Sequence, residues 1–335
     1  MTNKIHLPVV ESEQPQEDSS NQPEKTKLVF PTGKPHISYS ELHDWMECSW
    51  RHKLKHIDKL DLDGPTIHTE FGQVVHDAME TYLMLPKIER KPINASIYQK
   101  MFKDKFDALD ISHESADKQA ELLKQFAEFN DKIVALLEDA PKWMDIQFPD
   151  WETVAAEDLL YEPIPNQEDI KFKGFVDAFI KVPKRRKVRK PKKSSGGGGL
   201  SLSKILDAEE ASEYEIVPGE FEHFVLDWKT TSWGWTADKK RDFNKQLQIM
   251  LYKIFYCQKM NLDLKEIKCG FVLLKRDPNK EGSYCEFVPV SVGEKSMERA
   301  LSVVNSMVNQ VKQGRTMKNR WSCRFCKFAN TKHCM

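Results

Sequence analysis

The spacing of apolar residues changes partway along this chain of 335 residues. From residue 36 to about residue 140, apolar side chains recur every three or four positions, which is the period of a helix with one buried face. This pattern predicts helices in HISYSELHDWMECSWRHKLKHI, EFGQVVHDAMETYLML, YQKMFKDKFDAL and KQAELLKQFAEFNDKIVALL. In the first segment, Ser38 and Glu41 fit a capping box at the start of the helix.

Beyond residue 150 the pattern becomes that of strands. β-branched and aromatic residues dominate TVAAEDLLYEPI, DIKFKGFVDAFIKV and EFEHFVLDWKT. A long helix in KRDFNKQLQIMLYKIFYCQKM follows, then strands in IKCGFVLLKR and YCEFVPVSV, and a last helix near EKSMERALSVVNSMVNQVKQ. We therefore predict an α/β fold in which helices flank a central mixed sheet, with residues 90–145 as a helical insertion.

Two stretches are too polar to join this core. Residues 1–36 are rich in Glu, Gln, Ser, Pro and Asn, which predicts a disordered tail and leaves residues 37–335 as a single domain. The basic run KVPKRRKVRKPKK, residues 181–193, is followed by SSGGGG, which predicts a mobile loop between two strands over residues 183–220. Three interpretations of this loop stay open: a linker without a role, an arm that contacts phosphates, and a nuclear-localisation signal in residues 184–193.

Composition narrows the classes of protein. Lys plus Arg and Asp plus Glu both number 51, so the formal net charge is zero and contact with nucleic acid would need a local basic patch. The chain has no run of about 18 apolar residues and no N-terminal signal pattern. We therefore expect no membrane partner and a cytoplasmic location, with a nuclear location left open by the basic run.

Two acidic residues and a lysine fall inside predicted strands. Asp177 lies in KGFVDAFI, and Asp227 and Lys229 lie in FVLDWKTTS. Side chains alternate along a strand, so Asp227 and Lys229 share one face while Trp228 points to the other. Carboxylates are preferred ligands of Mg²⁺, and a lysine beside them can offset charge in a transition state. An isolated D-x-K is usually a surface ion pair. A catalytic role for Asp227 and Lys229 therefore needs support from the motifs around them.

The neighbouring motifs, taken in order, resemble those of the PD-(D/E)XK nuclease superfamily, and specifically its RecB-like branch. That branch combines an S-x-S-x-L…C helix, a G-x-x-x-H helix, a glutamate strand, G-x-x-D, D-x-K and Q-x-x-x-Y. The matching residues are Ser38, Ser40 and Leu42 with Cys48, Gly72 with His76, Glu157, Gly174 with Asp177, Asp227 with Lys229, and Gln248 with Tyr252. The insert between G-x-x-D and D-x-K is longer than the hairpin usual in the family.

The resemblance implies a restriction-endonuclease-like core and metal-dependent hydrolysis of DNA. His76, Asp177 and Asp227 would bind Mg²⁺ or Mn²⁺, and Lys229 would be catalytic. Without the resemblance, His76 would be read as a surface or core residue of its helix.

Three further residues would support the catalytic site or contact DNA. They are Glu157, Gln248 and Tyr252. Glu152 and Glu162 are rivals of the first, Gln246 is a rival of the second, and the tyrosine could simply be a core residue.

A cysteine cluster lies near the C-terminus, in residues 321–335. Cys323, Cys326 and Cys334 have C-x2-C-x7-C spacing, which favours metal binding over disulfides in a chain without a secretion signal. A tetrahedral zinc or a cubane cluster needs four ligands, and the fourth candidates are Cys48 and, for zinc, His333. Some RecB-like nucleases hold a [4Fe–4S] cluster with one N-terminal and three C-terminal cysteines, so the resemblance implies a cluster that ties the chain ends together. The other cysteines fall on apolar elements and are expected in the core: Cys257, Cys269 and Cys285.

We therefore expect a DNA exonuclease that acts on single-stranded ends in DNA repair, recombination or replication. Trp233 and Trp235 follow Lys229 and either stack on unpaired bases or pack within the protein. The alternative is a non-catalytic or accessory DNA-binding subunit of a larger nuclease–helicase or CRISPR-adaptation complex. A nuclease with replication, recombination or CRISPR-adaptation proteins as partners is a further possibility. The chain has no Walker motif, so it supplies no ATP motor of its own.

Overall fold

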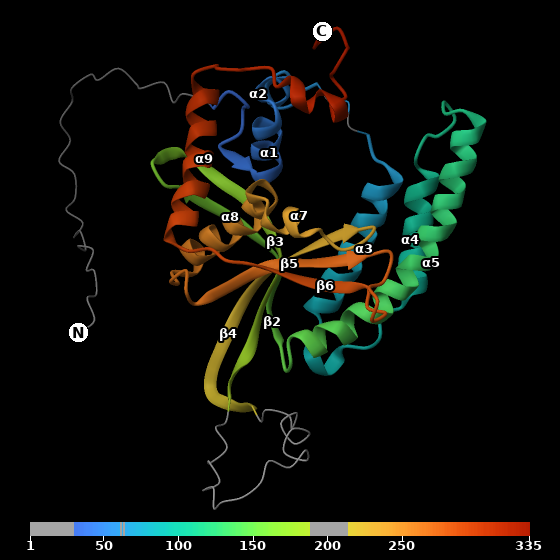
Figure 1. Ribbon diagram of the computed structural model, residues 1–335, viewed down its shortest axis with the longest axis vertical. Helices are drawn as coiled ribbons and strands as arrows, with labels where there is room; N and C mark the ends of the chain where they lie inside the picture. Colours follow the sequence, from blue (N-terminus) through green and yellow to red (C-terminus); the bar gives the residue numbers. More distant parts are fainter. Residues whose placement is uncertain (1–29, 61, 63, 188–213) are drawn as a thin grey trace, which may run out of the picture.

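A mixed sheet lies at the centre of the computed structural model, which describes residues 30–60, 62, 64–187 and 214–335 (Figure 1). The strand order is β1-β3-β4-β5-β6, and β2 pairs with β3. The pairs β1–β3 and β4–β5 are parallel, whereas β2–β3, β3–β4 and β5–β6 are antiparallel. The strands are β1 His36–Ser38, β2 Glu152–Ile164, β3 Gln167–Lys187, β4 Tyr214–Thr231, β5 Ile267–Lys275 and β6 Cys285–Val290. The predicted α/β fold is confirmed.

Most of the helices begin at a residue whose side-chain oxygen accepts a hydrogen bond from the first turn. Ser38, Thr66, Ser115 and Asp242 cap α1, α3, α5 and α8 in this way and satisfy otherwise unpaired N–H groups. The helices are α1 Tyr39–Glu47, α2 Ser49–His52, α3 Ile67–Met84, α4 Ala95–Asp107, α5 Ala116–Gln147, α7 Ala237–Arg241, α8 Phe243–Met260 and α9 Glu294–Lys312. A π-helical turn, η1 (Lys53–Ile57), continues α2, and short 3₁₀ turns are η2 (Lys87–Glu89) and η4 (Arg320–Phe325).

Each face of the sheet is covered by its own apolar core. On one face, α8 and α9 pack with Phe271 and Leu273 of β5. On the other face, α3, α4 and α5 pack with Val272 and Leu274 of the same strand. A strand covered on both faces contains consecutive apolar residues, as β5 does. In Figure 1, α4 and α5 lie beyond α3 and together span most of the segment predicted as a helical insertion.

The packed chain begins earlier than predicted. Phe30, which lies in the segment assigned to a disordered tail, is only 4% exposed and joins the core on the α8 face. β1 already begins at His36. Local composition could not reveal this, because one aromatic side chain that packs against distant elements overrides its polar neighbours. The rest of the predicted tail, residues 1–29, lies outside the described residues.

The boundaries of the predicted loop also differ. β3 continues to Lys187 and β4 begins at Tyr214, so both ends of the 183–220 segment are paired strand. Opposite charges face each other across this ladder, with Arg186 Nη2 lying 3.1 Å from Glu215 Oε2. Such cross-strand pairs stabilise a polar hairpin, whereas the polar composition of this segment predicts a loop. Residues 188–213 of the predicted loop lie outside the described residues. Among the described helices, none is long and apolar enough to cross a membrane.

One glycine of the sheet permits a test of this packing. A Cβ atom at Gly270 of β5 would lie 2.5 Å from the Phe287 ring and 2.6 Å from the Val288 carbonyl oxygen. Because the backbone oxygen cannot move aside, Gly270→Ala should lower the free energy of unfolding by about 1–3 kcal/mol. Gly64→Ala, where a Cβ meets nothing within 4 Å, should change it by less than about 0.5 kcal/mol. Equal effects in denaturant titrations would contradict the assigned register.

Candidate active site

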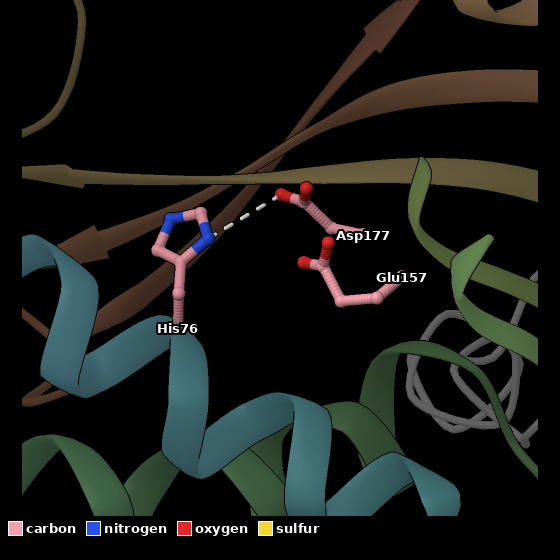
Figure 2. A group of neighbouring side chains, drawn as sticks. All are labelled: His76, Glu157 and Asp177. Atoms are coloured by element: carbon pink, nitrogen blue, oxygen red, sulfur yellow. Dashed lines mark ion pairs between the residues drawn. The ribbon is translucent and has the colours of Figure 1, made fainter. Parts of the chain in front are cut away.

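One histidine and two carboxylates converge where α3 meets strands β2 and β3. A ligand atom from each of His76, Glu157 and Asp177 lies within 4.8 Å of the others. Figure 2 shows the imidazole of His76 directed at Asp177, with 3.7 Å between Nδ1 and Oδ2, and Glu157 beside them. An imidazole with two carboxylates is a suitable ligand set for a divalent metal ion.

The register of β2 and β3 brings the two carboxylates together. Ala156 pairs with Ala178 and Asp158 with Val176, so Glu157 falls opposite Asp177. Residues directly opposite each other have Cβ atoms about 4.5–5.5 Å apart, and like charges in this position destabilise the sheet. Glu157 also has a φ of +47°, a left-handed conformation that costs free energy in a residue with a side chain. Strain and repulsion at one point are typical of a functional site.

A glycine brings α3 close enough for His76 to reach the sheet. A Cβ atom at Gly72 would lie 3.1 Å from Oγ1 of Thr230 in β4, which is tighter than ordinary contact. His76 follows one turn later on the same face of the helix. The G-x-x-x-H spacing therefore has a physical cause, since the glycine sets the distance that the histidine side chain spans.

Two aspartates carry the buried negative charge of the site. Asp177 and Asp227 are both buried, and Asp227 is only 1% exposed. The Trp228 N–H donates to Asp177 Oδ2 at 2.7 Å, which fixes that carboxylate. Burial and then the charge of Asp227 raise the pKa of Asp177 well above its ordinary value. A cation bound beside both groups would remove this penalty.

Lys229 lies beside Asp227 as the strand alternation predicts. Its Nζ forms an ion pair with the buried Asp227 carboxylate, 2.5 Å from Oδ2. Burial alone would lower the pKa of Lys229, but the charges of Asp227 and Asp177 outweigh it and raise the pKa. Lys229 is therefore a cation at neutral pH and suits charge stabilisation rather than proton abstraction.

Gln248 and Tyr252 come from α8 and lie against β3. Gln248 Nε2 donates to the Tyr252 hydroxyl at 3.1 Å. A Cβ at Gly174 would lie 2.8 Å from the Tyr252 ring, so the glycine of G-x-x-D is what admits this tyrosine. Burial raises the pKa of Tyr252, which keeps its hydroxyl protonated. The rival Gln246 is bonded elsewhere, to the Lys240 carbonyl at 2.5 Å.

Two cavities open beside the site. One, of about 430 Å³, is lined by Lys229, Gln248, Tyr39 and Trp235 among others. The other, of about 580 Å³, lies between the end of α3 and residues 152–158 of β2 and includes Glu157. Lys229 and Glu157 thus each line an open cavity, whereas Asp177 and Asp227 are buried.

Comparison with known proteins settles the family. The model of the PD-(D/E)XK nuclease superfamily matches residues 36–193 and 216–331. The chain belongs to the PD-(D/E)XK nuclease superfamily. A solved structure, the "Putative exonuclease" of Eubacterium rectale, shares 12% identity over 92% of each chain with a TM-score of 0.48. No curated protein matches.

Membership in this nuclease superfamily implies phosphodiester hydrolysis with a divalent metal ion and binding of DNA. The family resemblance predicts His76, Asp177 and Asp227 as metal ligands. The three side chains whose ligand atoms lie within 4.8 Å of one another are instead His76, Asp177 and Glu157. Asp227 as a ligand stays a prediction. The rival Glu152 is exposed and pairs with Lys181 at 2.8 Å.

Four cysteines of this nuclease line one small cavity at the junction of the chain ends. They are Cys48, Cys323, Cys326 and Cys334. Asn319 connects the two ends, since its side chain donates to the Glu47 carbonyl at 2.8 Å and its N–H donates to Cys48 Sγ at 3.3 Å. In Figure 1 the C-terminal segment lies beside α2. The side chain of His333, the rival ligand, is not among those lining this cavity, and its carbonyl accepts a hydrogen bond from Trp50.

The remaining cysteines and the two tryptophans after Lys229 have distinct environments. Cys257, Cys269 and Cys285 are buried, as expected of core residues. Burial raises the pKa of Cys257 to about 11 and that of Cys269 to about 12, so these thiols stay protonated. Trp233 is 69% exposed, whereas the Trp235 ring packs 5.1 Å from that of Phe271.

The raised pKa of Asp177 leads to a prediction about stability. A group whose pKa is raised by folding stabilises the protein at low pH, and this stabilisation is lost as the pH rises through the raised pKa. Asp177→Asn should therefore raise the melting temperature in EDTA at neutral pH. Mn²⁺ at about 100 times its Kd should stabilise the wild type by about 2.7 kcal/mol and this variant far less.

Asp169→Asn is the matched control, because Asp169 is an exposed carboxylate of the same strand. It should melt like the wild type in EDTA and gain the same stability from Mn²⁺. A lower melting temperature for Asp177→Asn, or an undiminished response to Mn²⁺, would contradict the assigned charge cluster.

Proposed function

We propose that this protein is a metal-dependent DNA exonuclease of the RecB-like branch that degrades single-stranded ends. The observation that carries the proposal is the convergence of His76, Glu157 and Asp177 next to the buried Asp227–Lys229 pair. A non-catalytic DNA-binding subunit would not need these charges, which cost folding free energy when buried.

Each residue of the site would have its own role in the reaction. His76, Glu157 and Asp177, with Asp227 as a further ligand, would hold a divalent metal, which when bound would lower the pKa of water and stabilise charge on the scissile phosphate. Lys229, held by Asp227, offsets the negative charge that develops on the phosphate oxygens.

The backbone of β4 and two side chains of α8 would position the groups that act in the reaction. The Trp228 N–H holds the Asp177 carboxylate in one orientation. The Gln248 amide, fixed by the protonated Tyr252 hydroxyl, reaches the same cavity as Lys229 and can donate to a phosphate oxygen.

We infer a single strand as the substrate from the cavities together with an exposed aromatic ring. Cavities of about 430 and 580 Å³ have the size of sites for small molecules, so each can hold about one nucleotide. The exposed Trp233 offers a surface on which an unpaired base can stack.

End-labelled single-stranded DNA with Mg²⁺ or Mn²⁺ tests the reaction. Asp227→Asn and Lys229→Ala should each lower kcat by about 10²-fold or more, since charge stabilisation in the transition state is lost. Asp107→Asn and Lys103→Ala change an exposed ion pair of the same kind on α4 and should leave kcat unchanged. Cleavage by Asp227→Asn at the wild-type rate would refute the assigned site.

Circular single-stranded DNA and linear duplex DNA distinguish the type of nuclease. An exonuclease for single strands leaves the circle intact, because the circle has no end, and degrades the duplex slowly. Cleavage of the circle at the rate of the linear strand would instead establish an endonuclease.

We also propose that Cys48, Cys323, Cys326 and Cys334 hold a [4Fe–4S] cluster, which would join the two ends of the nuclease domain. The four cysteines line one cavity, which supplies the four sulfur ligands that either a tetrahedral zinc ion or a cubane cluster needs. The resemblance to RecB-like nucleases favours the [4Fe–4S] cluster over zinc.

Purification without oxygen tests the cluster. The protein should be brown, with broad absorbance near about 400 nm from iron–sulfur ligation. Cys48→Ala should bleach the protein and lower its melting temperature, since the energy of metal binding contributes to folding. Cys257→Ala, at a buried cysteine of α8, should keep the colour. A colourless protein with one zinc per chain would refute this assignment.

A further inference from the structure

The cavity beside Lys229 carries more positive charge than the proposed reaction uses. Lys239 and Lys245 line it together with Lys229 and Gln248. We propose that Lys239 and Lys245 bind a phosphate of the substrate strand next to the scissile one, so that this cavity is a phosphate subsite. The inference rests on the proposed nuclease function and specifies which residues hold the strand.

The two lysines lack carboxylate partners. Within the described ranges, neither Lys239 nor Lys245 forms an ion pair, whereas the adjacent Lys240 pairs with Glu286. Burial and then the charge of Lys245 lower the pKa of Lys239, so the two ammonium groups repel each other across the cavity. An anion between them would relieve the repulsion, and the substrate backbone supplies such an anion.

Both lysines are exposed and line the cavity from elements next to the site. Lys239 Nζ lies 4.8 Å from the centre of the Trp235 ring, which itself packs on Phe271. Lys245 is in the first turn of α8, three residues before Gln248 and therefore on the same stripe of the helix. A strand that contacts Gln248 can thus also contact Lys245 in the same cavity.

The other charged groups that line the cavity do not cancel this charge. Asp44 is the acidic residue among them, and it already pairs with Arg51 at 2.8 Å, His56 at 2.8 Å and Lys55 at 3.4 Å. Burial and the charge of Lys245 lower the pKa of His43, which leaves that imidazole neutral at physiological pH. The cavity is therefore cationic.

The volume of this cavity, about 430 Å³, is large enough for one nucleotide. The phosphate bound there can be an internal diester or a terminal monoester, and both carry the same recognisable chemistry.

Binding of a single-stranded oligonucleotide over a range of salt concentrations, with Ca²⁺ in place of Mg²⁺, tests the subsite. In Lys239→Ala/Lys245→Ala the slope of log K against log salt should become less steep by about 0.7, since the two lysines neutralise one phosphate and each phosphate neutralised on a single strand contributes about 0.7. With Mg²⁺, KM should rise while kcat stays near the wild-type value. Lys239→Arg/Lys245→Arg should restore the slope, because the charge is retained.

The matched control is Lys280→Ala/Lys295→Ala, which removes two exposed lysines away from the cavity and should keep the wild-type slope. A wild-type slope and KM in the Lys239→Ala/Lys245→Ala variant would overturn the subsite while leaving the nuclease function intact. Absence of cleavage by the wild type would instead refute the proposed function, and the salt slope would still test the subsite.

Oligonucleotides with a 5′-phosphate or a 5′-hydroxyl separate the two kinds of phosphate. If the double variant loses a preference of the wild type for the phosphorylated end, the subsite takes a terminal phosphate. If the variant weakens binding of both oligonucleotides equally, the subsite takes an internal phosphate.

Discussion

Negative charge buried in the middle of the sheet is the constraint on which the rest of this structure depends. Asp177 and Asp227 come from neighbouring strands, and Glu157 lies opposite Asp177 on the third strand. Each carboxylate loses solvation and repels the others, so the metal-free site opposes folding. Lys229 offsets part of this charge, and a divalent cation would offset the remainder. Metal binding should therefore stabilise the folded protein. Without the metal, the preorganised charges of the site lower its stability.

The helices that complete the site approach the sheet only because glycines allow it. Gly72 lets α3 contact Thr230 of β4, and Gly174 accepts the ring of Tyr252 from α8. A larger residue at either position would move a helix outward and withdraw the side chains that it carries. Two of the nuclease motifs, G-x-x-x-H and G-x-x-D, are therefore geometric requirements as much as chemical ones, since the glycine of each lets a helix lie close to the sheet.

Features fixed by local sequence could be predicted, whereas those fixed by long-range pairing could not. Strand alternation alone indicated that Lys229 would share a face with Asp227. The left-handed backbone of Glu157 and its position opposite Asp177 depend on the register between two strands, which no local pattern contains. For the same reason the sequence did not reveal that Lys239 and Lys245 share a cavity with Lys229, because these residues lie on three different elements.

Anomalous diffraction from a crystal soaked in Mn²⁺ tests the central claim most directly. The claim is that His76, Glu157 and Asp177 hold the catalytic metal because their ligand atoms already converge within 4.8 Å. The account predicts a strong anomalous peak at bonding distance from all three side chains in the wild type, and its loss in Asp177→Asn. A peak elsewhere, or no peak between these residues at saturating Mn²⁺, would contradict it.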